Sequence, residues 1–302
     1  MIRPPFLQAG DRVGVLALAS YVDYASLADG LRILREDWQL EVVEGTTLQK
    51  QYHQFAGTDQ ERQQDLQHFL DDTSLKAIFS ARGGYGTSKI IDGLNFRKFR
   101  KHPKWIVGFS DITAINCHLY CMGFENLHAT MPKLFGREGS ENALDTLKKA
   151  LWGEELSYEV ASNPFDKLGT GHGEVVGGNL CLLAHLIGSK SDVDTRHTLL
   201  FIEDVDEYYY NLDRMMVQLK RAGKLNKLAG LIVGQFTDLK DNSTTSFGKS
   251  HYEIIAEHVA SYDYPVCYDF PVGHVNDNRA MIVGRDAKLE VKKGKNTLHF
   301  AR

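Results

Sequence analysis

The feature that most constrains the fold is an almost uninterrupted apolar run near the start of the sequence, at residues 12–19. A run of this kind is typical of a parallel strand that is covered on both faces. Residues 24–38 then place leucines at helical spacing and predict an amphipathic helix, and residues 39–44 predict a second strand. A strand, a helix and a strand in this order form a β-α-β unit, so the sequence predicts a parallel sheet.

The rest of the chain continues this alternation and predicts an α/β protein, and 302 residues are enough for two domains. Residues 153–172 are rich in Gly, Ser, Asn and Asp and have weak periodicity, which indicates a crossing between domains. We therefore predict an N-terminal domain over residues 1–152, with a doubly wound and mostly parallel sheet, and a C-terminal α/β domain over residues 173–302. Residues 281–300 predict a β-hairpin at the end of the chain.

Ser110 lies where a short predicted strand, residues 105–107, turns into a helical pattern. A serine on such a turn projects its hydroxyl clear of the sheet, beside helix N-terminal N–H groups, and can act as a nucleophile with donors for an oxyanion. The Gly-Xaa-Ser-Xaa-Gly pattern of α/β-hydrolases is only half met, because Ile112 replaces the second glycine. Since serine is also a preferred N-cap residue, the local sequence leaves a nucleophile and a helix cap both open.

A glycine cluster at residues 83–86 follows another predicted strand, residues 76–80, and precedes a helix. Such a cluster cradles an anion or lets backbone approach a ligand, although a plain turn is equally compatible with it. Its spacing matches neither a P-loop nor a dinucleotide fingerprint. Because the carboxyl ends of parallel strands converge on one edge of a sheet, we expect N–H groups of this cluster and of Ser110 and Asp111 to lie close together.

A serine nucleophile needs a base and a group that orients the base. Among the twelve histidines, His274 is the one placed between a glycine and a polar loop at a predicted strand end. Glu203 follows the strong apolar strand of residues 198–202, where its carboxylate could hold an imidazole tautomer. A solvated helix N-terminus is the ordinary alternative for Glu203 and the acids after it.

Composition and motifs argue against several other classes. A net charge of -4 shows no basic excess, so no nucleic-acid partner is expected. No apolar run is long enough to span a bilayer or has the flanks of a signal peptide, so we expect a cytoplasmic protein without a membrane partner. The four cysteines form no Cys-Xaa-Xaa-Cys pair, and His274 and Asp277 lack any recognised ligand spacing, so neither a metal nor another cofactor is expected.

Several blocks of the sequence occur in the order in which one peptidase family has them. The chain resembles the LD-carboxypeptidases, cytosolic serine peptidases of cell-wall recycling, over nearly all of its length. The blocks are GDRVGV (10–15), ARGGYG (81–86), GFSDIT (108–113), GGNL (177–180), LFIEDV (200–205) and PVGHVNDNR (271–279). The family pattern differs at Leu18, where a proline is expected, and at residues 128–130, which are His-Ala-Thr in place of His-Gly-Pro.

The resemblance implies a catalytic triad of Ser110, Glu203 and His274 that converges across a cleft between two domains. It implies oxyanion donors at the backbone N–H groups of Gly84 and Asp111. The substrate it implies is the tetrapeptide stem of muropeptides, cut between the third-position diamino acid and the terminal D-alanine. A homodimer is also implied.

Arg82 and Asn179, which lie inside two of the blocks, are candidate substrate-binding residues.

Two other functions stay open. One is a microcin-immunity peptidase, which shares the family and the triad but hydrolyses a peptidyl-nucleotide or acyl-sulfamoyl adenylate; such proteins tend to be longer, so 302 residues favour the recycling enzyme. The other is a muropeptide-binding sensor without catalysis, which would have no need of all three triad groups.

Overall fold

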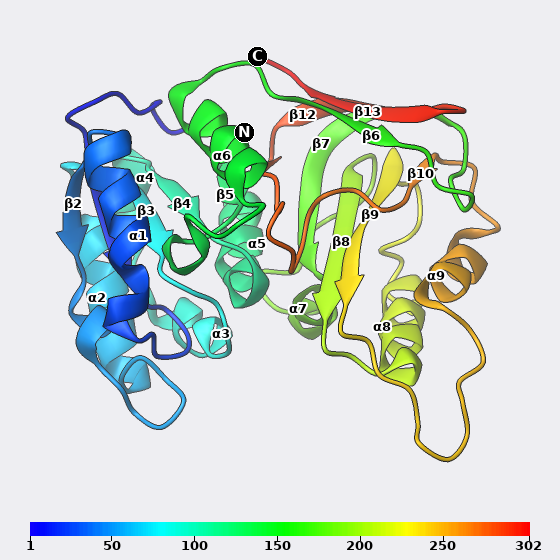
Figure 1. Cartoon of the computed structure of the whole chain (residues 1–302), viewed down its shortest axis with the longest axis horizontal. Helices are drawn as coiled ribbons and strands as arrows, with labels where there is room; N and C mark the ends of the chain where they lie inside the picture. The colour runs from blue at the N-terminus through cyan, green and yellow to red at the C-terminus, as the bar shows by residue number, and fades with distance from the viewer.

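The first of two β-sheets has six strands in the order β11-β5-β4-β3-β1-β2, in a computed structural model that describes residues 1–302 (Figure 1). The strands are β1 (Arg12–Leu16), β2 (Glu41–Glu44), β3 (Leu75–Ser80), β4 (Trp105–Val107), β5 (Asn126–His128) and β11 (Met281–Val283). All are parallel except β11, which pairs antiparallel with β5. The parallel sheet predicted from the first apolar run is therefore present.

Helices cover both faces of this sheet. They are α1 (Ala28–Arg32), α2 (Asp59–Asp71), α3 (Thr87–Ile90), α4 (Arg97–Lys101), α5 (Thr113–Cys121) and α6 (Glu141–Trp152). In β1, Val13 belongs to the same hydrophobic cluster as Leu31 of α1, whereas Leu16 belongs to the cluster that contains Phe69 of α2. Burial on both faces explains why the β1 sequence is apolar without alternation.

The second sheet has seven strands in the order β10-β9-β8-β7-β12-β13-β6. The strands are β6 (Ser157–Ala161), β7 (Gly169–Asn179), β8 (Leu199–Val205), β9 (Gly230–Thr237), β10 (Val266–Cys267), β12 (Asp286–Val291) and β13 (Lys295–Phe300), and the helices are α7 (Leu180–Leu186), α8 (Tyr209–Arg221) and α9 (His251–Val259). Strands β7 to β10 are parallel, and β12, β13 and β6 extend the sheet antiparallel. The sheet is therefore mixed.

Two segments differ from the sequence prediction. Residues 153–172, expected as a crossing, contain β6 and the start of β7, because the Gly-rich and polar residues there occupy strands of the antiparallel half of the sheet. Of the predicted hairpin, only β12 and β13 pair with each other, while β11 joins the first sheet. The residues of β11 are buried and apolar, and periodicity does not reveal which sheet such a strand joins.

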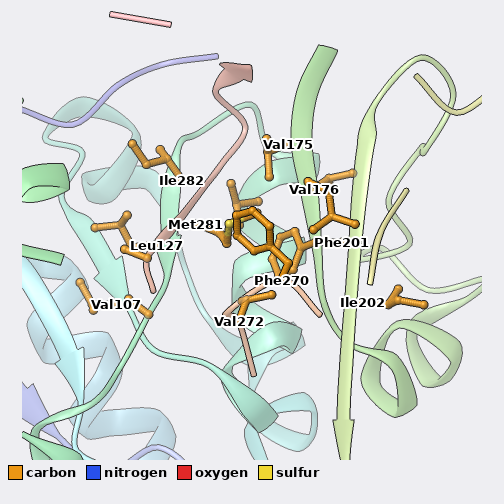
Figure 2. Close-up of a cluster of buried hydrophobic side chains, with 14 of the residues drawn as sticks. Val107, Leu127, Val175, Val176, Phe201, Ile202, Phe270, Val272, Met281 and Ile282 are labelled. Carbon is orange, nitrogen blue, oxygen red and sulfur yellow. The ribbon is translucent and has the colours of Figure 1, made fainter. Parts of the chain in front are cut away.

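A continuous hydrophobic cluster connects the two sheets. Figure 2 shows Leu127 of β5, Met281 of β11 and Val176 of β7 within one group of buried side chains, together with Phe201 of β8 and Phe270. All five are at most 1% exposed. Packing of this kind resists relative motion of the sheets. None of the helices combines the length and the apolar character that a membrane crossing requires.

Candidate active site

Ser110 occupies a strained turn between β4 and α5. Its φ is +64°, in the left-handed region that non-glycine residues rarely adopt, and it begins a single turn of 3-10 helix that ends at Ile112. A Cβ added to Gly83 would come within 2.9 Å of Ser110 Cβ, so glycine is required for the neighbouring loop to approach the serine. Phe109 occupies the N-cap position of this turn, so Ser110 does not cap it. Its hydroxyl is instead directed to His274.

The structure brings Ser110, His274 and Glu203 into one hydrogen-bonded chain. His274 Nε2 lies 3.0 Å from Ser110 Oγ, and His274 Nδ1 lies 2.7 Å from Glu203 Oε2. A carboxylate can only accept hydrogen bonds, so the neutral imidazole carries its proton on Nδ1. Nε2 then has a free lone pair for the serine hydroxyl.

The electrostatics of His274 follow from the same contacts. Burial by itself lowers the pKa of His274, but the hydrogen bond that Nδ1 donates to Glu203 and the charge of Glu203 act in the opposite direction and prevail, with smaller contributions from Asp204 and Asp238. The pKa of His274 is therefore raised above its ordinary value. Glu203 is fully buried, so its charge is poorly screened at the imidazole.

An irregularity in the second sheet lets the His274 loop reach Glu203. Between β8 and β9 the register shifts, so that Glu203 alone stands opposite Gly234 and Gln235. Gln235 lies outside the regular pairing of β8 with β9, and its N–H donates to Val272 O at 2.8 Å. Gly273 has a φ of +128°, and a Cβ there would lie 2.9 Å from Glu203 Cβ. A bulge and a glycine thus position the histidine, as is common beside active sites.

The glycine loop lies beside Ser110 and is held by buried groups. Gly84 has a φ of +120° and its N–H donates no hydrogen bond within the protein. Arg62, fully buried, donates to Gly86 O at 3.0 Å and to Leu18 O at 2.6 Å. Asp111 follows Ser110 in the first turn of its helix, where N–H groups lack intrahelical partners, and its carboxylate accepts from Thr87 N–H at 2.8 Å.

A pocket of about 350 Å³ opens at Ser110. Its lining comes from the segments after β3, β4 and β5, from the last residue of β8 and from the segment after β10: Arg82, Gly83, Gly84, Phe109, Ser110, Met131, Lys133, Leu134, Arg137, Val205 and His274. Arg82, a candidate substrate-binding residue, is among them. The sequence analysis missed Lys133 and Arg137, although they follow β5 and the carboxyl end of β5 belongs to the same edge of the sheet as Ser110.

Asn179 does not line this pocket, contrary to the sequence expectation. Its Oδ1 accepts from Leu182 N–H at 3.2 Å and caps α7, and its Nδ2 donates to Asp204 Oδ1 at 2.8 Å. Burial, and then the charge of Glu203, raise the pKa of Asp204 to about 7. Asn179 thus supports the carboxylate next to Glu203.

His128 is fully buried beside Phe109, the ring that packs against His274. Its ring centroid is 5.8 Å from that of Phe109 and 5.0 Å from that of Phe201, and Phe109 in turn lies 4.9 Å from His274. Burial lowers the pKa of His128 to about 3, so it is neutral. This aromatic wall covers one side of His274 without adding a charge.

Two family models match the chain. One, described as the LD-carboxypeptidase N-terminal domain, matches residues 13–129, and the other, the LD-carboxypeptidase C-terminal domain, matches residues 172–289. A probable murein peptide carboxypeptidase of Bacillus subtilis (strain 168) is 36% identical over 295 residues, covering 95% of this chain and 91% of that protein. The chain belongs to the LD-carboxypeptidase family.

Other members and structures agree with this assignment. A murein tetrapeptide carboxypeptidase of Pseudomonas aeruginosa is 30% identical and covers 92% of this chain and 93% of its own length. The muramoyltetrapeptide carboxypeptidase from Oxalobacter formigenes has a TM-score of 0.86 at 27% identity, over 96% of this chain and 99% of that one. The microcin C7 self-immunity protein MccF has a TM-score of 0.89 over 100% and 99%, but at 20% identity this likeness shows the fold alone. The predicted two-domain α/β fold is confirmed.

Proposed function

We propose that this protein is a serine LD-carboxypeptidase that releases the terminal D-alanine from the tetrapeptide stem of muropeptides, in the cytoplasm, during peptidoglycan recycling. The observation that carries the proposal is the hydrogen-bonded chain from Ser110 through His274 to Glu203. Ser110 and His274 line a pocket that can receive a substrate. The names of the relatives from Bacillus subtilis and Pseudomonas aeruginosa support a murein peptide as substrate.

In the proposed reaction, Ser110 Oγ attacks the scissile carbonyl carbon while His274 Nε2 takes the hydroxyl proton. The N–H groups of Gly84 and Asp111 donate to the resulting oxyanion. His274 then gives its proton to the amine of D-alanine, the carbon–nitrogen bond breaks, and D-alanine leaves. His274 then takes a proton from water, and the resulting hydroxide attacks the carbonyl carbon of the acyl-enzyme. The bond from that carbon to Ser110 Oγ breaks, and His274 gives the proton to Ser110 Oγ.

Glu203 has two roles in this scheme. It accepts from Nδ1 and thereby holds the tautomer whose Nε2 can act as a base. It also stabilises the imidazolium that forms when His274 takes the proton, in agreement with the direction of the His274 pKa shift. The triad is drawn from both sheets, so we further propose that the active site lies in the cleft between two domains.

The test is the release of D-alanine from a purified tetrapeptide muropeptide, followed by mass spectrometry, with labelling by a fluorophosphonate probe in parallel. We expect turnover and labelling by the wild type, and neither by Ser110→Ala. Ser88→Ala is a matched control, because Ser88 Oγ lies 3.2 Å from His185 Nε2 in another serine–histidine contact, outside the pocket. Labelling that survives in Ser110→Ala and is lost in Ser88→Ala would refute the assignment of the nucleophile.

The same experiment distinguishes the alternatives. A muropeptide-binding sensor would bind the tetrapeptide without releasing D-alanine and without labelling. A microcin-immunity peptidase would be labelled but would prefer an acyl-sulfamoyl adenylate to the tetrapeptide. We also propose a homodimer, which analytical ultracentrifugation checks directly; a monomer across the working concentration range would contradict it.

A further inference from the structure

The pocket beside Ser110 is positively charged, although the protein as a whole has a net charge of -4. Its charged lining consists of Arg82, Lys133 and Arg137, and no carboxylate lines it. Glu203 contacts the far nitrogen of the His274 ring and is fully buried. Asp23 acts on Lys133 electrostatically, but its carboxylate accepts a hydrogen bond from Ala25 N–H at 3.2 Å. The pocket therefore offers positive charge to an anion.

A carboxypeptidase substrate brings its anion to a fixed place. In the C-terminal residue, three bonds separate the carboxylate carbon from the scissile carbonyl carbon. When that carbonyl is held at Ser110 Oγ, the carboxylate lies within about 4 Å of it. The group that binds the carboxylate must therefore line the same pocket as Ser110.

The three cations differ in how available and how well positioned they are. Arg82 donates to Tyr21 O at 2.9 Å, so part of its guanidinium is already engaged. Arg137 is exposed, in a loop beyond the end of the short helix at residues 132–134. Lys133 is half-buried, and its N–H donates to Ala81 O at 3.1 Å, which ties its backbone to the strand end before the glycine loop.

We propose that Lys133 binds the terminal carboxylate of the substrate and so restricts cleavage to a single C-terminal residue. This inference rests on the proposed function and names the group that selects the substrate. Burial, and then the charges of Arg82 and Arg137, lower the pKa of Lys133. A carboxylate bound to the Lys133 ammonium compensates the burial of its charge and the repulsion from the two arginines. Lys133 is therefore a favourable partner for a carboxylate.

The experiment compares a tetrapeptide that has a free C-terminal carboxylate with the same peptide as a C-terminal amide. Binding is measured by calorimetry in Ser110→Ala and in the double variant Ser110→Ala with Lys133→Gln, and turnover is measured in the two corresponding proteins with Ser110 intact. We expect Lys133→Gln to weaken binding of the acid, and to lower its kcat/KM, by about 10- to 150-fold, the range for a hydrogen bond to a charged group. The amide should change little, and Lys133→Arg should restore part of the preference for the acid.

One control shows which carboxylate of the substrate Lys133 binds, and a second shows whether the effect is specific to Lys133. A tetrapeptide with L-lysine at the third position lacks the second carboxylate of a diaminopimelate residue, so an effect that persists on it assigns Lys133 to the terminal carboxylate. An effect that vanishes there assigns Lys133 to the side-chain carboxylate and overturns the inference. Lys98→Gln, exposed on α4, should leave the ratio of acid to amide unchanged.

The outcomes separate this inference from the proposed function. An acid-to-amide binding ratio that Lys133→Gln does not alter overturns the inference, even if the wild type releases D-alanine. Binding that depends on Lys133, in a wild type that releases none, supports the inference and overturns the proposed function. Absence of binding to both peptides refutes both.

Discussion

Replacement of Glu203 by glutamine tests the proposed triad at its least accessible member. Glu203 is fully buried, but glutamine has nearly the same shape as glutamate, so the fold should tolerate the change. A glutamine amide, however, can turn its NH2 group toward His274 Nδ1, where the carboxylate now accepts at 2.7 Å. Nδ1 must then accept, the proton moves to Nε2, and Nε2 can no longer take the proton of Ser110.

The expected loss of kcat is about 10⁴-fold, the size found when a triad acid is replaced by its amide and the wrong tautomer results. That factor corresponds to about 5.5 kcal/mol of transition-state stabilisation. Thermal unfolding should shift far less than this value implies, because the contact replaced is a single hydrogen bond. Steady-state release of D-alanine, measured by mass spectrometry, gives the turnover, and calorimetric unfolding gives the stability.

The pH profile of kcat/KM gives a second, independent measure of how Glu203 acts on His274. The base must be neutral to act, so in the wild type kcat/KM should fall as the pH is lowered through the raised pKa of His274. Without the charge of Glu203, only the smaller contributions of Asp204 and Asp238 oppose the lowering of the His274 pKa by burial. The acidic limb of the residual activity in Glu203→Gln should therefore move to lower pH. A limb that stays in place would mean that Glu203 does not set the His274 pKa.

Asp204→Asn is the matched control, since Asp204 is the adjacent buried carboxylate on β8 but contacts Asn179 and not His274. We expect its turnover to remain within about tenfold of the wild type, because the contact it loses is outside the triad. Near-normal turnover in Glu203→Gln together with an inactive Asp204→Asn would refute the choice of carboxylate.

The remaining predictions concern the other parts of the site. Ser110→Ala and His274→Ala should each remove several orders of magnitude of turnover, and the double variant should lose little more, because the residues act as a unit; multiplicative losses would contradict this. Tetrapeptide stems should release D-alanine far faster than pentapeptide stems, with a difference of up to about 10⁴- to 10⁵-fold when a polar partner is left unmatched, and an LL-configured C-terminal bond should not be cut. Mass spectrometry of the digests measures all three, and equal rates on the tetrapeptide and the pentapeptide would contradict the restriction to a single C-terminal residue. Gly273→Ala should reduce kcat more than it reduces thermal stability, because the added Cβ would displace Glu203; unchanged kcat would show that the loop tolerates a left-handed alanine.

The sequence predicted the elements that local pattern determines. The apolar run of β1 and the leucines of the helical segment after it are placed as expected. The turn at Ser110 was also visible, since a strand, a glycine and a helical pattern occur within a few residues. Its left-handed φ was not, because nothing in the local residue types requires it.

What the sequence could not reveal depends on contacts between distant segments. Glu203 was expected at the end of a strand, yet β8 continues to Val205, and the residue is set apart by the register shift against β9. Asn179 lies in a family block, but only its contact with Asp204 shows that it serves that carboxylate. Lys133 carries no motif at all, and its place beside Ser110 follows from the hydrogen bond to Ala81.

The segment that carries His274 explains why the two sheets need a fixed relation. It leaves the second sheet after β10 and enters the first sheet as β11, which pairs with β5. His274 therefore lies on the connection itself, between Ser110 from the first sheet and Glu203 from the second. The buried side chains of β11 anchor one end of this connection, and the hydrogen bond from Gln235 N–H to Val272 O anchors the other. The hydrogen bonds of the triad span two sheets, so their lengths are maintained only while both ends of this connection stay fixed. Strand β11, which sequence analysis assigned to a hairpin, is therefore the structural basis of the site.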